Sequence, residues 1–166
     1  MFRPLDSVDL KILRLLQEDA TLSVAEVAAS VNLSSTPCWK RIQRLQMDGV
    51  ITGRVAIVDQ VKMGLGLSVF VFIESGDHSA EWQTSFAVAL KQMPEVVEMY
   101  RLTGDFDYVL RVVVPDMKAY DQFYRKLIGT AALRNVTSRF AMEKIKSITA
   151  LPMQLSEQRN GPTIGI

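Results

Sequence analysis

Residues 22–47 read LSVAEVAASVNLSSTPCWKRIQRLQM, and this stretch decides the fold of the first third of the chain. It predicts two short helices joined by a tight turn, because apolar residues recur at helical spacing on both sides of Asn32. Ser23 is placed to cap the first helix, and Ser34 or Ser35 to cap the second. Asn tolerates the left-handed backbone that such a turn often needs. The stretch therefore predicts a helix-turn-helix.

The second of these helices, which we call the recognition helix, has one apolar side and one basic side. Cys38, Ile42 and Leu45 fall at i, i+4 and i+7 and are expected to face the core. No acidic residue occurs between Ser34 and Met47. Such a helix suits the major groove of DNA, with its first residues near base edges and its cations near phosphates. The expected base-edge contacts are Ser35, Thr36, Pro37 and Lys40, the expected phosphate contacts are Arg41 and Arg44, and Trp39 is a DNA-binding residue at the flank.

A further helix in front of this stretch completes the module. Asp6 followed by Asp9 is a variant of the capping box that opens helices. The apolar stripe of this helix is formed by Val8, Ile12, Leu15 and Leu16. The plainer alternative is a packed bundle with a solvated charged face, but the helix lengths, the turn and the one-sided charge together favour DNA reading. Residues 54–58, RVAIV, predict a strand that leads out of the module.

After Asp59 the apolar pattern changes from helical to alternating. The predicted order β-α-β-β-α-β is that of a ferredoxin-like sandwich, with both helices on one face of an antiparallel sheet. The predicted strands are 67–73, 96–102, 108–114 and 136–148, and the predicted helices are 80–92 and 117–128.

The strand 67–73 is apolar on both of its sides. Val69 and Val71 point one way, and Phe70 and Phe72 point the other. A sheet with one face in water would carry polar residues on that face. Exposed apolar patches of this kind usually mark a subunit interface, so we expect a homodimer formed sheet against sheet. Its twofold axis would present two recognition helices to a palindromic site in double-stranded DNA.

Residues 103–108, TGDFDY, lie between two predicted strands. Gly104 lets the backbone turn or approach a ligand closely. Asp105 and Asp107 supply carboxylates that can accept an ammonium group. Taken by itself the motif is more typical of a plain hairpin turn than of a ligand site, and both interpretations stay open at this point.

Composition limits the remaining possibilities. In 166 residues the chain has 48% hydrophobic and 22% charged residues and a net charge of +1, so basic charge for DNA must be local. A single cysteine, no signal-peptide pattern and no membrane span fit a cytoplasmic protein. Only one histidine, His78, is present, and it suits the start of a helix. We expect no catalytic site, no metal site and no cofactor beyond an effector, because no nucleophile–base pair, metal cluster or phosphate loop appears.

The chain resembles the Lrp/AsnC family of bacterial and archaeal regulators from Asp6 to about Pro152. The resemblance rests on residues 5–23, LDSVDLKILRLLQEDATLS, on the recognition helix, on DGVI at 48–51, on the GDFDY turn and on VPDMKAYDQFYRKL after it. It implies an α+β protein with an N-terminal winged helix-turn-helix followed by a ferredoxin-like βαββαβ amino-acid-sensing domain. The expected boundaries are 1–52 for DNA binding, 53–64 for a linker strand, 65–152 for ligand sensing and oligomerisation, and 153–166 for a tail.

The resemblance also implies dimers that assemble into an octamer and bind an amino acid at the contacts between dimers. By motif position it places effector contacts at Arg101, Thr103, Gly104, Asp105, Asp107, Met117, Ser138, Arg139, Phe140 and Ala141. The stretches TPCWKR, HSAEW and SRFAMEKIKSITALP are similar to the branch with cysteine-responsive activators of cysteine detoxification. The effector is thus expected to be cysteine, leucine or another small amino acid.

The expected function is a sequence-specific transcriptional regulator without catalysis, whose DNA binding or assembly is modulated by that effector. A nucleoid-type architectural protein with little sequence or effector dependence is the main alternative. It predicts scant discrimination between an operator and random duplex. An enzyme on a ferredoxin-like scaffold is the third possibility, and the missing catalytic groups disfavour it.

Overall fold

The structure is a computed structural model that describes residues 4–153. Contacts divide this part of the chain into two compact units, one made of residues 4–56 and 146–153 and the other of residues 57–145. The division differs from the boundaries expected from sequence, because residues 146–152 pack with the first unit. Residues 154–166 of the expected tail lie outside the described residues. No helix within residues 4–153 is long and apolar enough to span a membrane.

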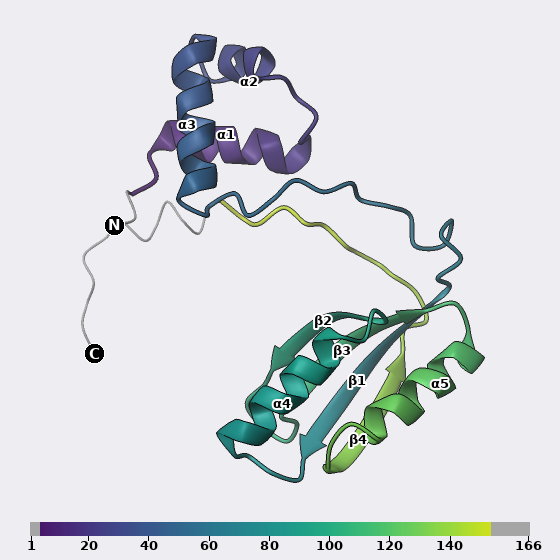
Figure 1. The fold of residues 1–166 in the computed structure, drawn as a ribbon. Coiled ribbons are helices and arrows are strands. Elements are labelled where there is room, and N and C mark those ends of the chain that lie inside the picture. Colours follow the sequence, from purple (N-terminus) through teal and green to yellow (C-terminus); the bar gives the residue numbers. More distant parts are fainter. Residues whose placement is uncertain (1–3, 154–166) are drawn as a thin grey trace. The chain divides into compact units, whose positions relative to one another are not determined.

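The first unit contains the three expected helices, α1 (Ser7–Glu18), α2 (Val24–Ser30) and α3 (Ser35–Met47) (Figure 1). The predicted capping box of α1 is confirmed: the Asp6 carboxylate accepts the backbone N–H of Asp9, and the Asp9 carboxylate accepts that of Asp6. Ser23 and Glu26 form a second capping box at α2. These caps satisfy N–H groups that have no partner inside the helix.

The turn between α2 and α3 has the predicted left-handed residue, because Asn32 has φ +56°. The core of the unit is built on Ile12, Val27, Ala28, Cys38 and Leu45, and its other buried members are Leu13, Val31 and Ile42. The predicted inner side of the recognition helix is therefore confirmed, and α3 is that helix. Val8, Leu15 and Leu16 are only partly buried against this core, and Leu13 was not in the predicted stripe.

The predicted strand at residues 54–58 is wrong. Residues 48–66 contain turns and extended chain but no strand, and the side chains of Val55 and Ile57 are 83% and 76% exposed. The alternating β-branched pattern is present, but a strand also needs a neighbour with which to exchange backbone hydrogen bonds. The wing expected after the recognition helix is accordingly a turn at Gly49 in this chain.

The second unit has the predicted order β1 (Leu67–Ser75), α4 (Ala80–Lys91), β2 (Val96–Arg101), β3 (Tyr108–Val114), α5 (Met117–Ile128) and β4 (Leu133–Phe140). The strands form one antiparallel sheet in the order β2-β3-β1-β4. Helices α4 and α5 cover one face of this sheet (Figure 1). The ferredoxin-like prediction is confirmed.

The last strand was misplaced by the sequence prediction. It starts at Leu133 rather than Val136 and ends at Phe140 rather than Ile148. Phe140 pairs with Val69, close to the first residue of β1, so residues 141–148 run past the edge of their partner strand. The end of β4 is therefore set by its pairing with β1 and not by the apolar pattern of its own residues.

The two faces of the sheet differ in what covers them. The face toward the helices carries Val69, Val71, Ile73, Leu110 and Val112, all fully buried against Phe86, Leu90, Phe123 and Leu127. We call the other side the open face. Its residues on β1 and β3 are Ser68, Phe70, Phe72, Glu74, Val109, Arg111 and Val113, and its residues on β2 and β4 include Glu98, Tyr100, Asn135, Thr137 and Arg139.

Candidate functional site

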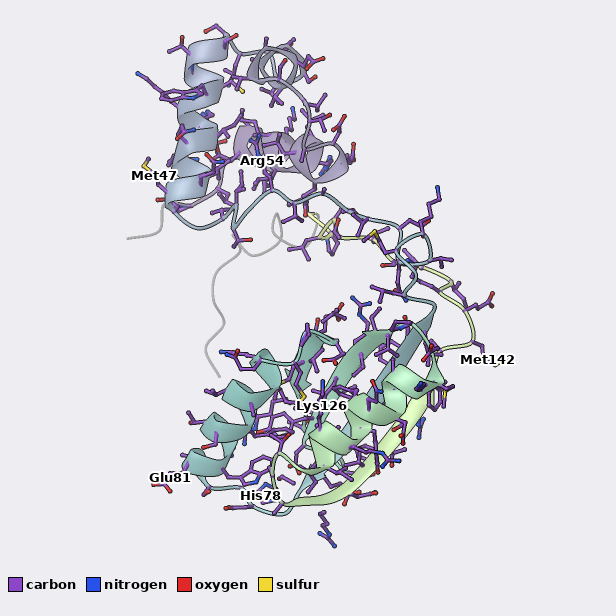
Figure 2. The ribbon with its side chains drawn as sticks, turned by 45° about the vertical axis from the view of Figure 1, so that its right-hand side comes forward. Met47, Arg54, His78, Glu81, Lys126 and Met142 are labelled. Carbon is purple, nitrogen blue, oxygen red and sulfur yellow. The ribbon has the colours of Figure 1, made fainter. Side chains whose placement is uncertain are left out.

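The outer side of α3 is exposed, as the predicted DNA-binding role requires. Ser35, Thr36, Pro37 and Lys40 are all exposed, and the Trp39 side chain is 50% exposed at the flank. Met47 continues this side at 79% exposure and points away from the other two helices (Figure 2). Lys40 has no ion-pair partner within residues 4–153. A helix with this exposed edge can enter a major groove about 12 Å wide.

Arg41 and Arg44 differ from this expectation of free cations. They share the flank of α3 that faces α1, and their guanidinium groups pair with two carboxylates there. Arg41 Nη1 lies 2.6 Å from Asp6 Oδ2 and 2.7 Å from Asp9 Oδ1, and Arg44 Nη2 bonds to Asp9 Oδ2. The Arg41 and Arg44 side chains are only 28% and 20% exposed. Both predicted phosphate contacts therefore have partners inside the domain.

The electrostatics of this cluster match its geometry. Burial acts to raise the pKa of the Asp6 carboxyl, but the Arg41 guanidinium and the backbone N–H groups of Asp9 and Val8 outweigh it and lower that pKa. Hydrogen bonds to Asp6 and Asp9 raise the pKa of Arg41. Two carboxylates and two guanidiniums cancel in charge, so Lys40 is left as the uncompensated cation of α3.

The TGDFDY turn joins β2 to β3, and its two carboxylates have different surroundings. Gly104 has φ +109°, a conformation that side-chain-bearing residues rarely adopt. Asp107 accepts the backbone N–H of Ser75 at 2.7 Å and the Ser75 hydroxyl at 2.9 Å, and so anchors the turn to the end of β1. Asp105 is exposed and has no hydrogen bond or ion pair within the described part of the chain. Asp105 is thus the carboxylate available to a ligand.

His78 lies beside Asp107, at the end of the sheet where α4 begins (Figure 2). Its Nδ1 lies 3.1 Å from the Ser75 hydroxyl oxygen and 3.6 Å from Asp107 Oδ1. This is not a nucleophile–base–acid relay, because Asp107 accepts the serine hydroxyl directly instead of orienting the far side of the imidazole. The backbone N–H of Ser75 lowers the pKa of Asp107, helped by the Ser75 hydroxyl and by the charges of His78 and Arg101, against a smaller effect of burial.

The lowered pKa of Asp107 predicts how Asp107→Asn will respond to pH. A carboxyl with a folded pKa below its ordinary value of 3.8 stabilises the fold above that pH, and the stabilisation disappears as pH falls through the folded pKa. At pH 7 we expect the wild type to unfold at a higher temperature than Asp107→Asn, and the two midpoints to converge below about pH 4. Thermal unfolding followed by circular dichroism measures both. A gap that stays constant with pH would contradict the assignment.

Of the remaining predicted effector residues, Met117, Phe140 and Ala141 lie at the opposite end of the sheet, and Ser138 lies at its middle, opposite Val71. Met117 opens α5 and is 58% exposed. Ser138 and Phe140 face α5: the Ser138 hydroxyl bonds to the Tyr120 hydroxyl, and the Phe140 ring packs edge-on to the Tyr120 ring at 5.1 Å. Ala141 donates its backbone N–H to Ser68 at 3.0 Å. The strand β3 that separates this end from the turn spans about 20 Å, at 3.4 Å per residue.

Arg139 stands apart from its neighbours, because it lies on the open face. Its guanidinium carbon lies 5.4 Å from the centre of the Phe72 ring, which in turn lies 5.3 Å from the Phe106 ring of the turn. The structure therefore brings Arg139 toward Thr103–Asp107 across the open face. It does not bring Ser138, Phe140 or Met117 there.

Sequence reasoning missed several residues of these sites. Asp9 was expected only as part of a cap, although it also binds both arginines. Phe72 and Phe106 were not among the predicted effector residues, and neither was Ser75. The sequence did carry a signal for the role of Asp9. It is an acidic residue on the inner face of one helix, and the recognition helix that follows carries two arginines and no acidic residue. A buried acid is rare unless it is paired. No group of histidine, cysteine and acidic residues suited to a metal occurs within residues 4–153.

Comparison with known proteins agrees with both halves of this description. The AsnC-type helix-turn-helix domain family matches residues 5–46, and the Lrp/AsnC ligand binding domain family matches residues 68–151. The DNA-binding transcriptional activator DecR of Escherichia coli is 50% identical over 90% of this chain and 99% of its own length.

Two solved structures share the fold. The AsnC family transcriptional regulator from Agrobacterium tumefaciens is 53% identical, with a TM-score of 0.88 over 91% of this chain and 99% of its own. A transcriptional regulator from Neisseria meningitidis, solved in complex with L-methionine, is 31% identical, with a TM-score of 0.86 over 91% of this chain and 98% of its own. The family models and the solved structures match nearly the whole described chain, including the helix-turn-helix. The chain therefore belongs to the Lrp/AsnC family of DNA-binding transcriptional regulators, with an amino-acid-binding regulatory domain and no enzymatic role.

Proposed function

We propose that this regulator forms a homodimer by apposing two open faces, and that an amino acid bound between subunits changes how the assembly holds DNA. The observation that supports the dimer is the apolar centre of the open face. Phe70, on the inner strand β1, is 39% exposed in the single chain, and Tyr100, on the edge strand β2, is 57% exposed. Apolar side chains at the middle of a sheet are stabilised when a second surface removes them from water. A twofold dimer presents two copies of α3 to a palindromic duplex.

The effector site is proposed to combine residues of neighbouring subunits. Within one chain the turn residues 101–107 and the group of Met117, Phe140 and Ala141 lie at opposite ends of the sheet. One small amino acid is far shorter than the roughly 20 Å between them. A site that uses both groups therefore needs two subunits, and we place it at the contacts between dimers of an octamer.

The polar groups of the turn region suit the two charged ends of a free amino acid. Asp105 is proposed to accept the ammonium group, because Asp107 is already bonded to Ser75. Arg139 offers a guanidinium for the carboxylate, which such groups bind with two parallel hydrogen bonds. The L-methionine complex of the Neisseria relative supports an amino acid as the ligand class. The resemblance to the cysteine-responsive branch makes cysteine the first candidate, followed by leucine and other small amino acids.

On the DNA side we propose that Ser35, Thr36, Pro37, Trp39 and Lys40 contact the duplex. All are exposed on or beside the outer side of α3. We place this activity in the cytoplasm. Cys38 is buried and is the single cysteine of the sequence, so the chain cannot form an internal disulfide, as is usual in a reducing compartment.

Titration with the twenty amino acids tests the effector proposal. We expect at least one small amino acid to raise the thermal midpoint, because a ligand that binds only the folded state stabilises it. The same amino acid should change operator affinity by about 5- to 150-fold, the usual range for coupled sites. Asp105→Ala should remove both responses, whereas Asp121→Ala, an exposed carboxylate on α5, should retain them. If none of the twenty changes the midpoint or the affinity, the effector proposal fails.

A further inference from the structure

We propose that Asp9 is a positioning residue that holds the recognition helix in the orientation needed for DNA binding. In this proposal Arg41 and Arg44 bind Asp9 rather than DNA phosphates. The proposal rests on the proposed DNA-binding role of α3. Asp9 is fully buried, with 0% of its surface exposed, and it is the one charged residue buried in the first unit among residues 4–56 and 146–153. A buried carboxylate is tolerated only when its oxygens are fully bonded.

The bonds to Asp9 join α1 to α3. Its Oδ2 accepts the Asp6 backbone N–H at 3.2 Å, which fixes the carboxylate to the first turn of α1. Its two oxygens then accept one guanidinium each from α3, Arg41 on Oδ1 and Arg44 on Oδ2. The two arginines are three residues apart, so they lie one above the other on a single flank of α3. Two attachment points on one flank fix both the rotation of α3 about its own axis and its position along α1.

This rotation decides which side chains meet the bases. Thr36 and Lys40 lie on the side of α3 away from Cys38, Ile42 and Leu45, and the arginines lie between these sides. A small rotation of α3 would exchange Lys40 for an arginine at the DNA surface. Base contacts depend on geometry, whereas phosphate attraction is far less demanding. The arrangement therefore contributes to base discrimination more than to general affinity.

The salt dependence of DNA binding separates the two roles of a cation. Each phosphate neutralised adds about 0.9 to the slope of log affinity against log salt. We expect Lys40→Ala to reduce this slope by about 0.9 for each engaged helix, with an unchanged thermal midpoint. We expect Arg44→Ala to leave the slope unchanged and to lower the midpoint. Binding to a random duplex provides the slopes without knowledge of the operator.

Asp9→Asn tests the positioning role directly in the full-length protein. Asparagine keeps the shape and the bond to the Asp6 N–H. It removes the one charge that retains Arg44 and one of the two carboxylates that retain Arg41, the other being Asp6. The affinity ratio between a duplex selected by the wild type from a randomised pool and a random duplex should fall by about tenfold or more. The slope should rise by about 0.9 for each arginine that reaches a phosphate. Both are measured at a temperature where the variant is fully folded.

The outcomes are distinct. If Asp9→Asn keeps the wild-type ratio and slope and only unfolds earlier, Asp9 is a stabilising residue and the proposal is wrong. If Arg44→Ala reduces the slope as much as Lys40→Ala does, Arg44 binds phosphate and the proposal is wrong. Should Asp9→Asn not fold, Arg44→Lys and Arg44→Ala carry the test, since loss of the ratio with an unchanged slope supports positioning. If the wild type itself selects no sequence, the proposed function fails, while the slopes on random duplex still test the arginines.

Discussion

Phe70→Lys is expected to dissociate the proposed dimer. Phe70 lies at the middle of the open face, opposite Arg111 on β3 and Arg139 on β4. A lysine there would stand between Arg139 and the Arg111–Glu98 ion pair, and closing the dimer would bury it without a carboxylate of its own. An uncompensated buried charge costs about 3–5 kcal/mol. That energy corresponds to a loss of more than about a hundredfold in dimer affinity.

Sedimentation equilibrium over a range of concentrations measures this effect. The matched control is Val88→Lys, which adds the same charge to α4, on the other side of the sheet, where the valine is already 54% exposed. The control should associate as the wild type does. A dimer of unchanged affinity in Phe70→Lys would show that subunits pair through some other surface, and a monomeric wild type would show that the open face faces water.

Leu45→Ala is expected to destabilise the first unit by about 2–5 kcal/mol, the usual cost of truncating a buried leucine. Leu45 is fully buried in the core shared by the three helices, and its carbonyl accepts the backbone N–H groups of Val50 and Ile51 after the end of α3. Met47→Ala, two residues away and 79% exposed, should change the free energy of unfolding by less than about 0.5 kcal/mol. The pair therefore tests which side of α3 faces inward.

Urea unfolding monitored by the fluorescence of Trp39 reports on this unit, since the other tryptophan, Trp82, lies on α4. All variants are made in a Trp82→Phe background, so that Trp39 is the one remaining tryptophan and its fluorescence reports on the first unit alone. Equal destabilisation by Leu45→Ala and Met47→Ala would contradict the orientation of the recognition helix.

Local chemistry predicted the local features of this fold well. Asp6, Ser23 and Asn32 act within a few residues of their own positions, so caps and turn could be predicted from short-range rules. The order of strands and helices in the second unit followed from a change in apolar period. The strands that failed, at residues 54–58 and beyond Phe140, failed because a strand depends on a partner that no local pattern identifies.

The site was less predictable for the same physical reason. That Arg41 faces Asp9 depends on how α1 packs against α3, which spacing along one helix does not reveal. Asp105 and Asp107 look equivalent in sequence, but only Asp107 reaches Ser75, from which it is separated by α4 and β2. Ser138 and Arg139 were assigned together by motif position, although alternation along β4 sends them to opposite faces of the sheet.

The first unit takes its last pieces from the far end of the chain. Leu151 donates its backbone N–H to the Gln17 side chain at 2.7 Å, and Met153 packs against the core of the three helices. During translation, α1, α2 and α3 leave the ribosome long before these residues exist. At about 5–20 residues per second, the first unit lacks these residues for several seconds while the second unit is synthesised. A nascent chain therefore completes the core of its first unit only after the whole second unit has been synthesised.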